Sequence, residues 1–296
     1  MAAGEAVYGT SAPARFWLVV EQNGPWGRSA ATQSYLPHDL GEELTRRCRT
    51  AGGRLLLMRR PGIHAEPRSG PRRCYVAWSG AGAWLLFGRV EEPDDLLHLP
   101  FASLEEGDRS AVLAALPQFR EVDPVLLVCT NGRHDVCCAI RGRPVAVATG
   151  ERFQGRVWEC SHTGGHRFSP TGVLLPWGRA LARMNERTAT DVLVHAERGR
   201  LPVEMLGPWH DRGASALAPQ LQVGESSVRA LIGESDLEAL AAFSRGPREV
   251  GVAHRDGRQW LVHLSVMEGG RRRNSCGEPE EPARTWKAAV RQIRPA

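Results

Sequence analysis

Short apolar runs separated by polar turns predict an alternation of strands and helices along most of the chain. The continuous apolar runs at 16–21, 54–59 and 125–128 are typical of strands buried on both faces. Leu40, Leu44 and Cys48 recur every four residues and predict a helix that begins near Asp39. Further strands are predicted at 74–79, 83–90, 156–161 and 171–177, and further helices at 108–116, 135–148 and 188–197. This alternation indicates an α/β (α+β) fold.

The last third of the chain has a different pattern. Residues 226–233 and 234–243 read as two helices, and a β-hairpin is predicted around Asp256-Gly257, the strongest hairpin signal in the chain. We therefore predict three domains, at 1–120, 121–200 and 201–296, of which the last is a small α+β unit. Within the second domain, Pro144 is expected to kink or interrupt the helix at 135–148.

The first two domains are built on a similar plan, which leads us to hypothesise a degenerate duplication. Residues 19–24 align with 127–132 at an offset of 108, and residues 54–64 align with 156–166 at an offset of 102. In this alignment Glu21 stands at the position of Cys129, and Arg60 stands at the position of His162. The first copy would then have kept the fold and lost the chemically active side chains.

Composition excludes several broad classes of function. The 296 residues are 42% hydrophobic and 24% charged, and the longest apolar runs are too short to span a bilayer. The net charge of +5 is small for this length and the arginines are scattered, so neither nucleic acid nor a membrane is an expected partner. The N-terminal residues do not resemble a secretory signal, and we expect a cytoplasmic protein without a disulfide framework.

Soft metal ligands gather at the ends of two predicted strands. Cys129 ends the strand at 125–128, and Cys137 and Cys138 follow within ten residues. His162 and His166 come after the strand at 156–161, and Gly164-Gly165 between them allows a tight loop. If the two strands are neighbours, thiols and imidazoles meet at one edge of the sheet. We expect a metal site there, with Cys160 pointing into the core.

The segments CTNGRHDVCC and WECSHTGGHRF resemble the sucrase/ferredoxin-like family, as does WLVVEQNGPWG near the N-terminus. The resemblance implies thioredoxin-like domains: a ferredoxin domain at 121–200, and at 1–120 a domain without cluster ligands. It also implies a [2Fe–2S] cluster bound by Cys129, Cys138, His162 and His166, with Cys137 as the alternative to Cys138. The usual first motif of the family resembles C-S-H-G-x-R-D-x-x-C, whereas here Thr130-Asn131 replaces Ser-His and His134 replaces Arg.

Two imidazoles in place of two thiolates lower the negative charge around the irons. The reduction potential is then expected to rise from about −400 mV toward roughly −150 to +300 mV. If the imidazoles face water, electron transfer is expected to be coupled to proton transfer. The protein would be a redox carrier rather than an enzyme with its own substrate, and its redox partner protein is not identified by the sequence.

Two other readings of these residues stay open at this point. Two Cys and two His also suit structural zinc, so the cofactor is zinc in the second reading. A thiol-dependent oxidoreductase is the third, although the C-x-x-C spacing of thioredoxins is absent.

Overall fold

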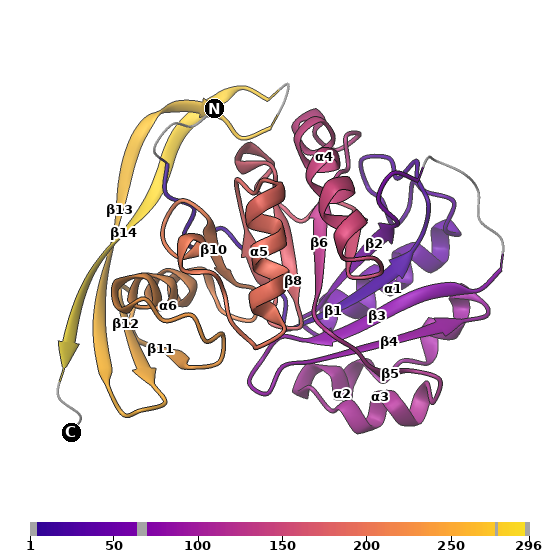
Figure 1. The fold of residues 1–296 in the computed structure, drawn as a ribbon, viewed down its shortest axis with the longest axis horizontal. Coiled ribbons are helices and arrows are strands. Elements are labelled where there is room, and N and C mark those ends of the chain that lie inside the picture. The colour runs from indigo at the N-terminus through magenta and orange to yellow at the C-terminus, as the bar shows by residue number, and fades with distance from the viewer. Residues whose placement is uncertain (1–4, 64–69, 276–277, 294–296) are drawn as a thin grey trace.

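A computed structural model describes residues 5–63, 70–275 and 278–293. Within these ranges, ten strands form one large mixed sheet, four strands form a separate sheet, and helices pack against both (Figure 1). The predicted mixed α/β class is therefore confirmed. In the described parts of the chain, none of the helices combines the length and the apolar character needed to cross a membrane.

The first half of the large sheet is a parallel strand pair extended by antiparallel strands. Its strands are β1 (Phe16–Glu21), β2 (Arg54–Arg59), β3 (Arg72–Trp78), β4 (Trp84–Val90) and β5 (Arg120–Glu121). Its helices are α1 (His38–Thr50), η1 (Pro93–His98), α2 (Phe101–Glu106) and α3 (Arg109–Ala115). The helix α1 connects the parallel strands β1 and β2, while β3 pairs antiparallel with β1 and β4 with β3.

The second half repeats this plan. Its strands are β6 (Val125–Cys129), β7 (Val157–Cys160), β8 (Gly172–Leu175), β9 (Arg179–Leu181) and β10 (Asp211–Ala214). Its helices are α4 (Val136–Arg152), η2 (His166–Phe168), α5 (Glu186–Ala196) and η3 (Val203–Met205). Contrary to expectation, α4 continues through Pro144 as one helix. Pro144 and Ile140 are both exposed, so water can solvate the Ile140 carbonyl that loses its intrahelical partner.

The two halves agree not only in topology but in register. Val19 pairs with Leu56 in the first half, and Leu127 pairs with Trp158 in the second. These pairs are related by the same offsets of 108 and 102 that align the sequences. The pair two residues further on has the same offsets, because Glu21 opposite Met58 corresponds to Cys129 opposite Cys160. This agreement supports the duplication hypothesis; residues 64–69, which include the end of the aligned segment, lie outside the described residues.

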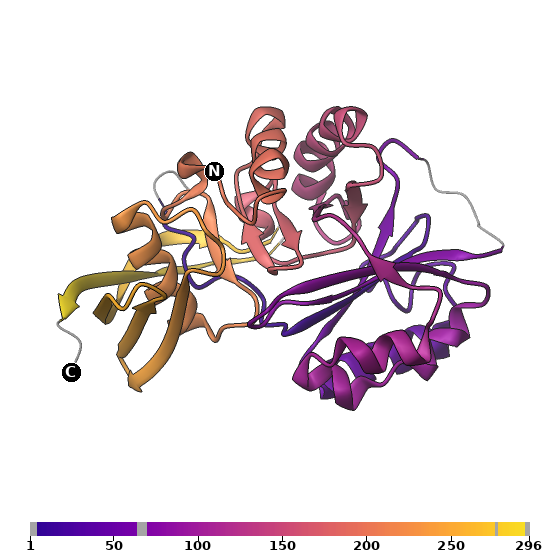
Figure 2. The same cartoon turned by 60° about the horizontal axis from the view of Figure 1, so that its bottom comes forward.

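The halves meet where β2 and β7 pair antiparallel over two residues, Met58 with Cys160 and Arg59 with Glu159. The helix-covered faces point outward, so α1, α2 and α3 lie on one side of the molecule and α4 and α5 on the other (Figure 2). The opposite faces of the two half-sheets pack on each other around Trp17, Leu127 and Trp158. Because the first two predicted domains share a sheet and a core, their independent folding stays a prediction.

The C-terminal unit is a curved four-stranded sheet packed on one helix. Its elements are α6 (Pro219–Ile232), β11 (Leu240–Gly246), β12 (Glu249–His254), β13 (Gln259–Arg273) and β14 (Glu280–Ile293). The hairpin at Asp256-Gly257 is confirmed, but the predicted helix at 234–243 is wrong. The helix α6 ends at Gly233 in a left-handed conformation, and β11 turns Leu240 and Ala242 toward the core while pairing with β12. Tertiary pairing therefore overrides the local helix preference.

A buried charge network attaches the C-terminal unit to the large sheet. Arg179 on β9 forms ion pairs with Asp211 on β10 and with Glu225 on α6. Glu225 also accepts a hydrogen bond from Arg229 at 2.7 Å. Burial by itself raises the pKa of Glu225, but the charges of Arg179 and Arg229 outweigh it and lower this pKa to about 2. The carboxylate is therefore charged at neutral pH.

We expect Glu225→Gln to destabilise the fold by about 3–5 kcal/mol, because two buried guanidinium groups lose their shared counter-ion. Urea unfolding followed by circular dichroism measures the change. The matched control is Glu268→Gln, which removes an exposed partner of Arg284 and should cost no more than about 1 kcal/mol.

The unaltered chain and the Glu225→Gln variant together also test the lowered pKa of Glu225. The folded-state pKa of Glu225 lies below its ordinary value of 4.5, so its stabilisation is present above pH 4.5 and is lost as the pH falls through about 2. The stability difference between the unaltered chain and Glu225→Gln should therefore shrink over that window. A difference that stays constant down to pH 2 would contradict the network.

Candidate metal centre

Strand pairing brings the predicted ligands together at one edge of the sheet. Cys129 is the last residue of β6, and its neighbour Cys160 is the last residue of the parallel strand β7. His162 follows β7 after one residue, and His166 begins η2. Cys138 lies in the first turn of α4, which starts seven residues after Cys129.

Local hydrogen bonds hold the loop between Cys129 and α4. The Asn131 side chain accepts hydrogen bonds from the backbone N–H groups of Arg133 and His134, at 3.2 and 3.3 Å. Asp135 is the N-cap of α4 and accepts from the Cys137 N–H at 2.9 Å. These contacts set the direction of the helix and turn Cys138 back toward Cys129.

The loop between the two histidines depends on glycine and on an arginine from a distant strand. Gly164 and Gly165 have φ angles of +83° and +69°, a region that favours glycine. A Cβ atom on Gly165 would lie 2.5 Å from Cζ of Arg212. Arg212 on β10 donates to the Gly164 carbonyl at 2.9 Å and also binds Thr10. The loop is thus clamped from the side away from the cysteines.

The ligand atoms form two overlapping groups. Those of Cys129, Cys138 and His162 lie within 4.8 Å of one another, and so do those of His134, His162 and His166. The Cys129 Sγ and His162 Nδ1 atoms are 3.9 Å apart. The structure therefore brings all four predicted ligands into one region, with His162 between the thiols and His166.

A shared proton couples the two thiols. A hydrogen bond from the Cys138 thiol lowers the pKa of Cys129 well below its ordinary value, against the effect of burial, and His162 lowers it further. The same hydrogen bond, together with burial, raises the pKa of Cys138. Binding of a metal would take up both sulfurs as thiolates and release their protons.

His166 has two ring nitrogens that could bind a metal ion. Both of its ring nitrogens are buried and neither makes a hydrogen bond within the described residues. Its nearest charged neighbour is Asp135, whose Oδ2 is 3.9 Å from Nε2. Burial lowers the pKa of His166, so the ring is neutral at pH 7 and keeps a lone pair for a metal.

Comparison with known families agrees with this geometry. The model of the sucrase/ferredoxin-like family matches residues 7–205. The chain belongs to the sucrase/ferredoxin-like family. No curated protein and no solved structure matches it.

In this sucrase/ferredoxin-like protein, one departure from the family motif lies inside the site. His134 stacks on His162 with ring centroids 3.7 Å apart and ring planes at 20°. Its Nδ1 atom is 3.2 Å from the Arg28 carbonyl oxygen, to which it can donate. Through this stacking, His134 restricts the ring of His162.

Cys137 and Cys160 lie near the candidate ligands but outside both groups of ligand atoms. Cys137 belongs to neither group of ligand atoms, and its carbonyl accepts a hydrogen bond from the Ser169 hydroxyl at 3.0 Å. Cys160 is fully buried in the core between the half-sheets, as predicted. Burial and the nearby Cys129 raise its pKa well above the ordinary value, so it stays a neutral thiol.

The equivalent place in the first half holds an ion pair instead of a thiolate. Glu21, which corresponds to Cys129, is buried and accepts a hydrogen bond from Arg73 at 3.0 Å. Glu21 therefore takes part in an ion pair at the position equivalent to Cys129.

Two contacts with the site come from outside the family match and could not be read from the motifs. One is the clamp by Arg212. The other is Ser275, just beyond β13, whose hydroxyl donates to Asp135 at 3.1 Å. The β13–β14 arm thus reaches back across the molecule to the N-cap of α4 (Figure 1).

The adjacent cysteines offer a matched test of the ligand assignment. Cys138→Ser should remove bound metal almost completely, because it deletes a thiol from the group around Cys129. Cys137→Ser should keep at least most of it. Metal content per chain after identical purification measures both; the reverse pattern would show that Cys137 is the ligand.

Proposed function

We propose that this protein is an electron carrier in which Cys129, Cys138, His162 and His166 hold a [2Fe–2S] cluster. The observation that carries the proposal is geometric: Cys129, Cys138 and His162 form one group of ligand atoms, and His162 joins it to His166, whose ring nitrogens are buried without a hydrogen bond within the described residues. Buried polar atoms without partners are rare unless a ligand completes them. Membership of the sucrase/ferredoxin-like family supports the same cofactor.

The spread of the donors favours two metal ions over one. Ligands of a single tetrahedral zinc, at about 2.0–2.3 Å from the ion, are separated by roughly 3.3–3.8 Å. The distance from Cys129 to His162 is close to this range, but the four ligand atoms do not form one group within 4.8 Å among the described residues. His166 lies beyond His162 in this set of ligand atoms, and a cluster with two irons would accommodate such a spread. Structural zinc is therefore the second candidate.

A thiol-dependent oxidoreductase is less well supported. Reactive cysteines need a thiolate that a substrate can reach. The Cys129 thiolate is favoured by its neighbours, but Cys129 and Cys138 are both fully buried. The site suits a buried metal better than disulfide exchange.

Each protein group has a defined part in such a carrier. The cluster, when bound, supplies a reversible one-electron couple. Cys129 and Cys138 contribute anionic sulfur, while His162 and His166 contribute neutral nitrogen and so reduce the negative charge at the site. Arg212 adds a buried positive charge behind the histidine loop. Both features favour uptake of an electron.

Protein purified without air should be red-brown and should contain iron and acid-labile sulfide in equal amounts, about two of each per chain. Visible absorption with iron and sulfide analysis checks this. A colourless protein that contains zinc would reject the electron carrier and leave structural zinc.

Replacing an imidazole by a thiolate should shift the potential in a known direction. The unaltered protein is expected within roughly −150 to +300 mV, with a potential that falls as the pH rises. His166→Cys adds negative charge and should lower the potential toward about −400 mV and weaken the pH dependence. Redox titration at several pH values measures both effects. A potential that is unchanged in His166→Cys would exclude His166 as a ligand.

A further inference from the structure

The outer face of α4 exposes apolar side chains beside the candidate metal centre. Val136 is 52% exposed and Ile140 is 68% exposed, one helical turn apart. Ile63, across a pocket from α4, is 42% exposed. Neighbouring apolar side chains with this exposure are typical of a surface that another molecule covers.

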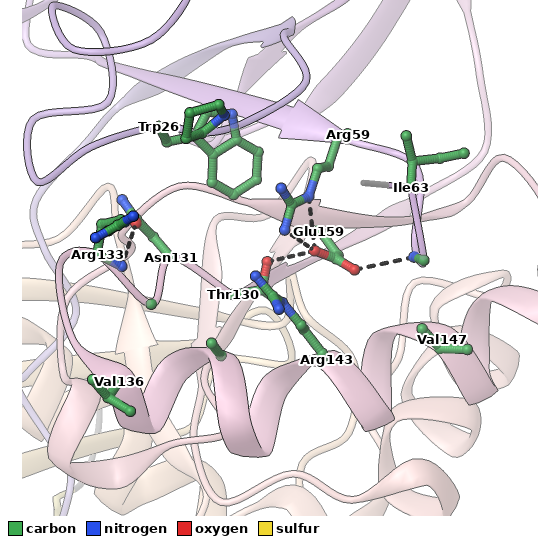
Figure 3. Close-up of a pocket in the computed structure, with 14 residues that line it drawn as sticks. Trp26, Arg59, Ile63, Thr130, Asn131, Arg133, Val136, Arg143, Val147 and Glu159 are labelled. Carbon is green, nitrogen blue, oxygen red and sulfur yellow. Dashed lines mark hydrogen bonds and ion pairs between the residues drawn. The ribbon is translucent and has the colours of Figure 1, made fainter. Parts of the chain in front are cut away.

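A pocket of about 520 Å³ lies next to this face, at the seam between the two halves (Figure 3). Its walls include Trp26 and Ile63 from the first half and Val136 and Val147 from α4. A pocket of this size, lined mainly by apolar groups, can accept a large side chain.

The floor of the pocket is electrically neutral. Glu159 accepts hydrogen bonds from the Arg59 guanidinium at 2.6 and 2.9 Å, from the Thr130 hydroxyl at 2.8 Å and from the Gly62 N–H at 3.1 Å. Trp26 covers Arg59, with the guanidinium carbon 4.5 Å from the ring centroid. These groups satisfy one another, so the floor leaves no charge for an incoming ligand to neutralise.

The rim, in contrast, carries unpaired positive charge. Arg133 and Arg143 line the pocket and are exposed, and neither forms an ion pair with any part of the chain that the structure describes. Many other arginines do have acidic partners, such as Arg73 with Glu21 and Arg156 with Glu197. An apolar centre with a one-signed rim has the composition of a transient protein interface.

The position of this face links it to electron transfer. Arg133 directly precedes His134, which stacks on His162, and Val136 lies two residues before Cys138. A protein bound to the first turns of α4 would therefore sit directly over the ligand-bearing end of the helix.

We propose that the outer face of α4, with its pocket and the rim of Arg133 and Arg143, is the docking surface for an acidic redox protein. This inference rests on the proposed electron-carrier function. The partner places carboxylates against the arginines and an apolar side chain in the pocket. One electron passes per encounter, so that the partner is oxidised by one electron as the cluster is reduced by one.

Reduced plant-type ferredoxin, an acidic protein with a lower potential, is a suitable probe. Its reaction with the oxidised chain is followed by stopped-flow absorption at several salt concentrations. The double variant Arg133→Glu/Arg143→Glu should lower the second-order rate constant at low salt about tenfold or more and converge with the unaltered chain at high salt. Ile140→Ser should lower the rate several-fold at every salt concentration, because apolar contact is not screened.

The control Arg245→Glu/Arg248→Glu makes the same change of net charge on exposed arginines of the C-terminal sheet and should leave the rate within twofold. Visible absorption and reduction by dithionite establish beforehand that each variant keeps its cluster. Equal rates for the α4 variants and the unaltered chain, or equal slowing by the control, would overturn the docking surface while leaving the carrier function intact. If no cluster is present, the carrier function fails, and calorimetric binding of the same ferredoxin decides whether the surface binds it.

Discussion

The buried ion pair between Arg59 and Glu159 is the contact on which the rest of the architecture depends. It joins β2 to β7, the only two strands whose backbones pair across the half-sheets within the described residues. Glu159 also binds the hydroxyl of Thr130, the residue after Cys129. One carboxylate therefore fixes both the seam and the first residue of the ligand loop. Loss of one partner would leave an uncompensated buried charge at the point where the halves meet.

This seam bears on how two halves of similar plan would hold a single site. Both halves present the ends of their parallel strands near the same line, since Met58 at the end of β2 pairs with Cys160 at the end of β7. Two equivalent sites so close together would compete for space and charge. The first half instead places the Glu21–Arg73 ion pair at the position equivalent to Cys129. The first half thus contributes a wall and a core, while the candidate ligands lie in the second half.

The ligand region could be predicted because it depends on local patterns and on one general rule. Strands of a parallel pair end at the same edge of a sheet. Because β6 and β7 are neighbours, Cys129 and His162 lie close together at that edge. The parts that could not be predicted depend on distant contacts. Arg212 reaches the histidine loop from β10, and the strand at Leu240 forms because it pairs with β12. Neither residue carries a local signal of its role.

The two sides of the candidate metal centre differ in chemistry, and this difference would matter for a carrier that exchanges protons as well as electrons. On the α4 side the surface is apolar with a pocket of about 520 Å³. On the other side a pocket of about 920 Å³ reaches His134 and His162 and is lined by charged groups of α1, including Asp39, Glu42 and Arg46. A protein bound to α4 would exclude water from its own side only. The imidazoles would keep a hydrated, ion-lined route on the opposite side, so partner docking and proton exchange would not compete for the same surface.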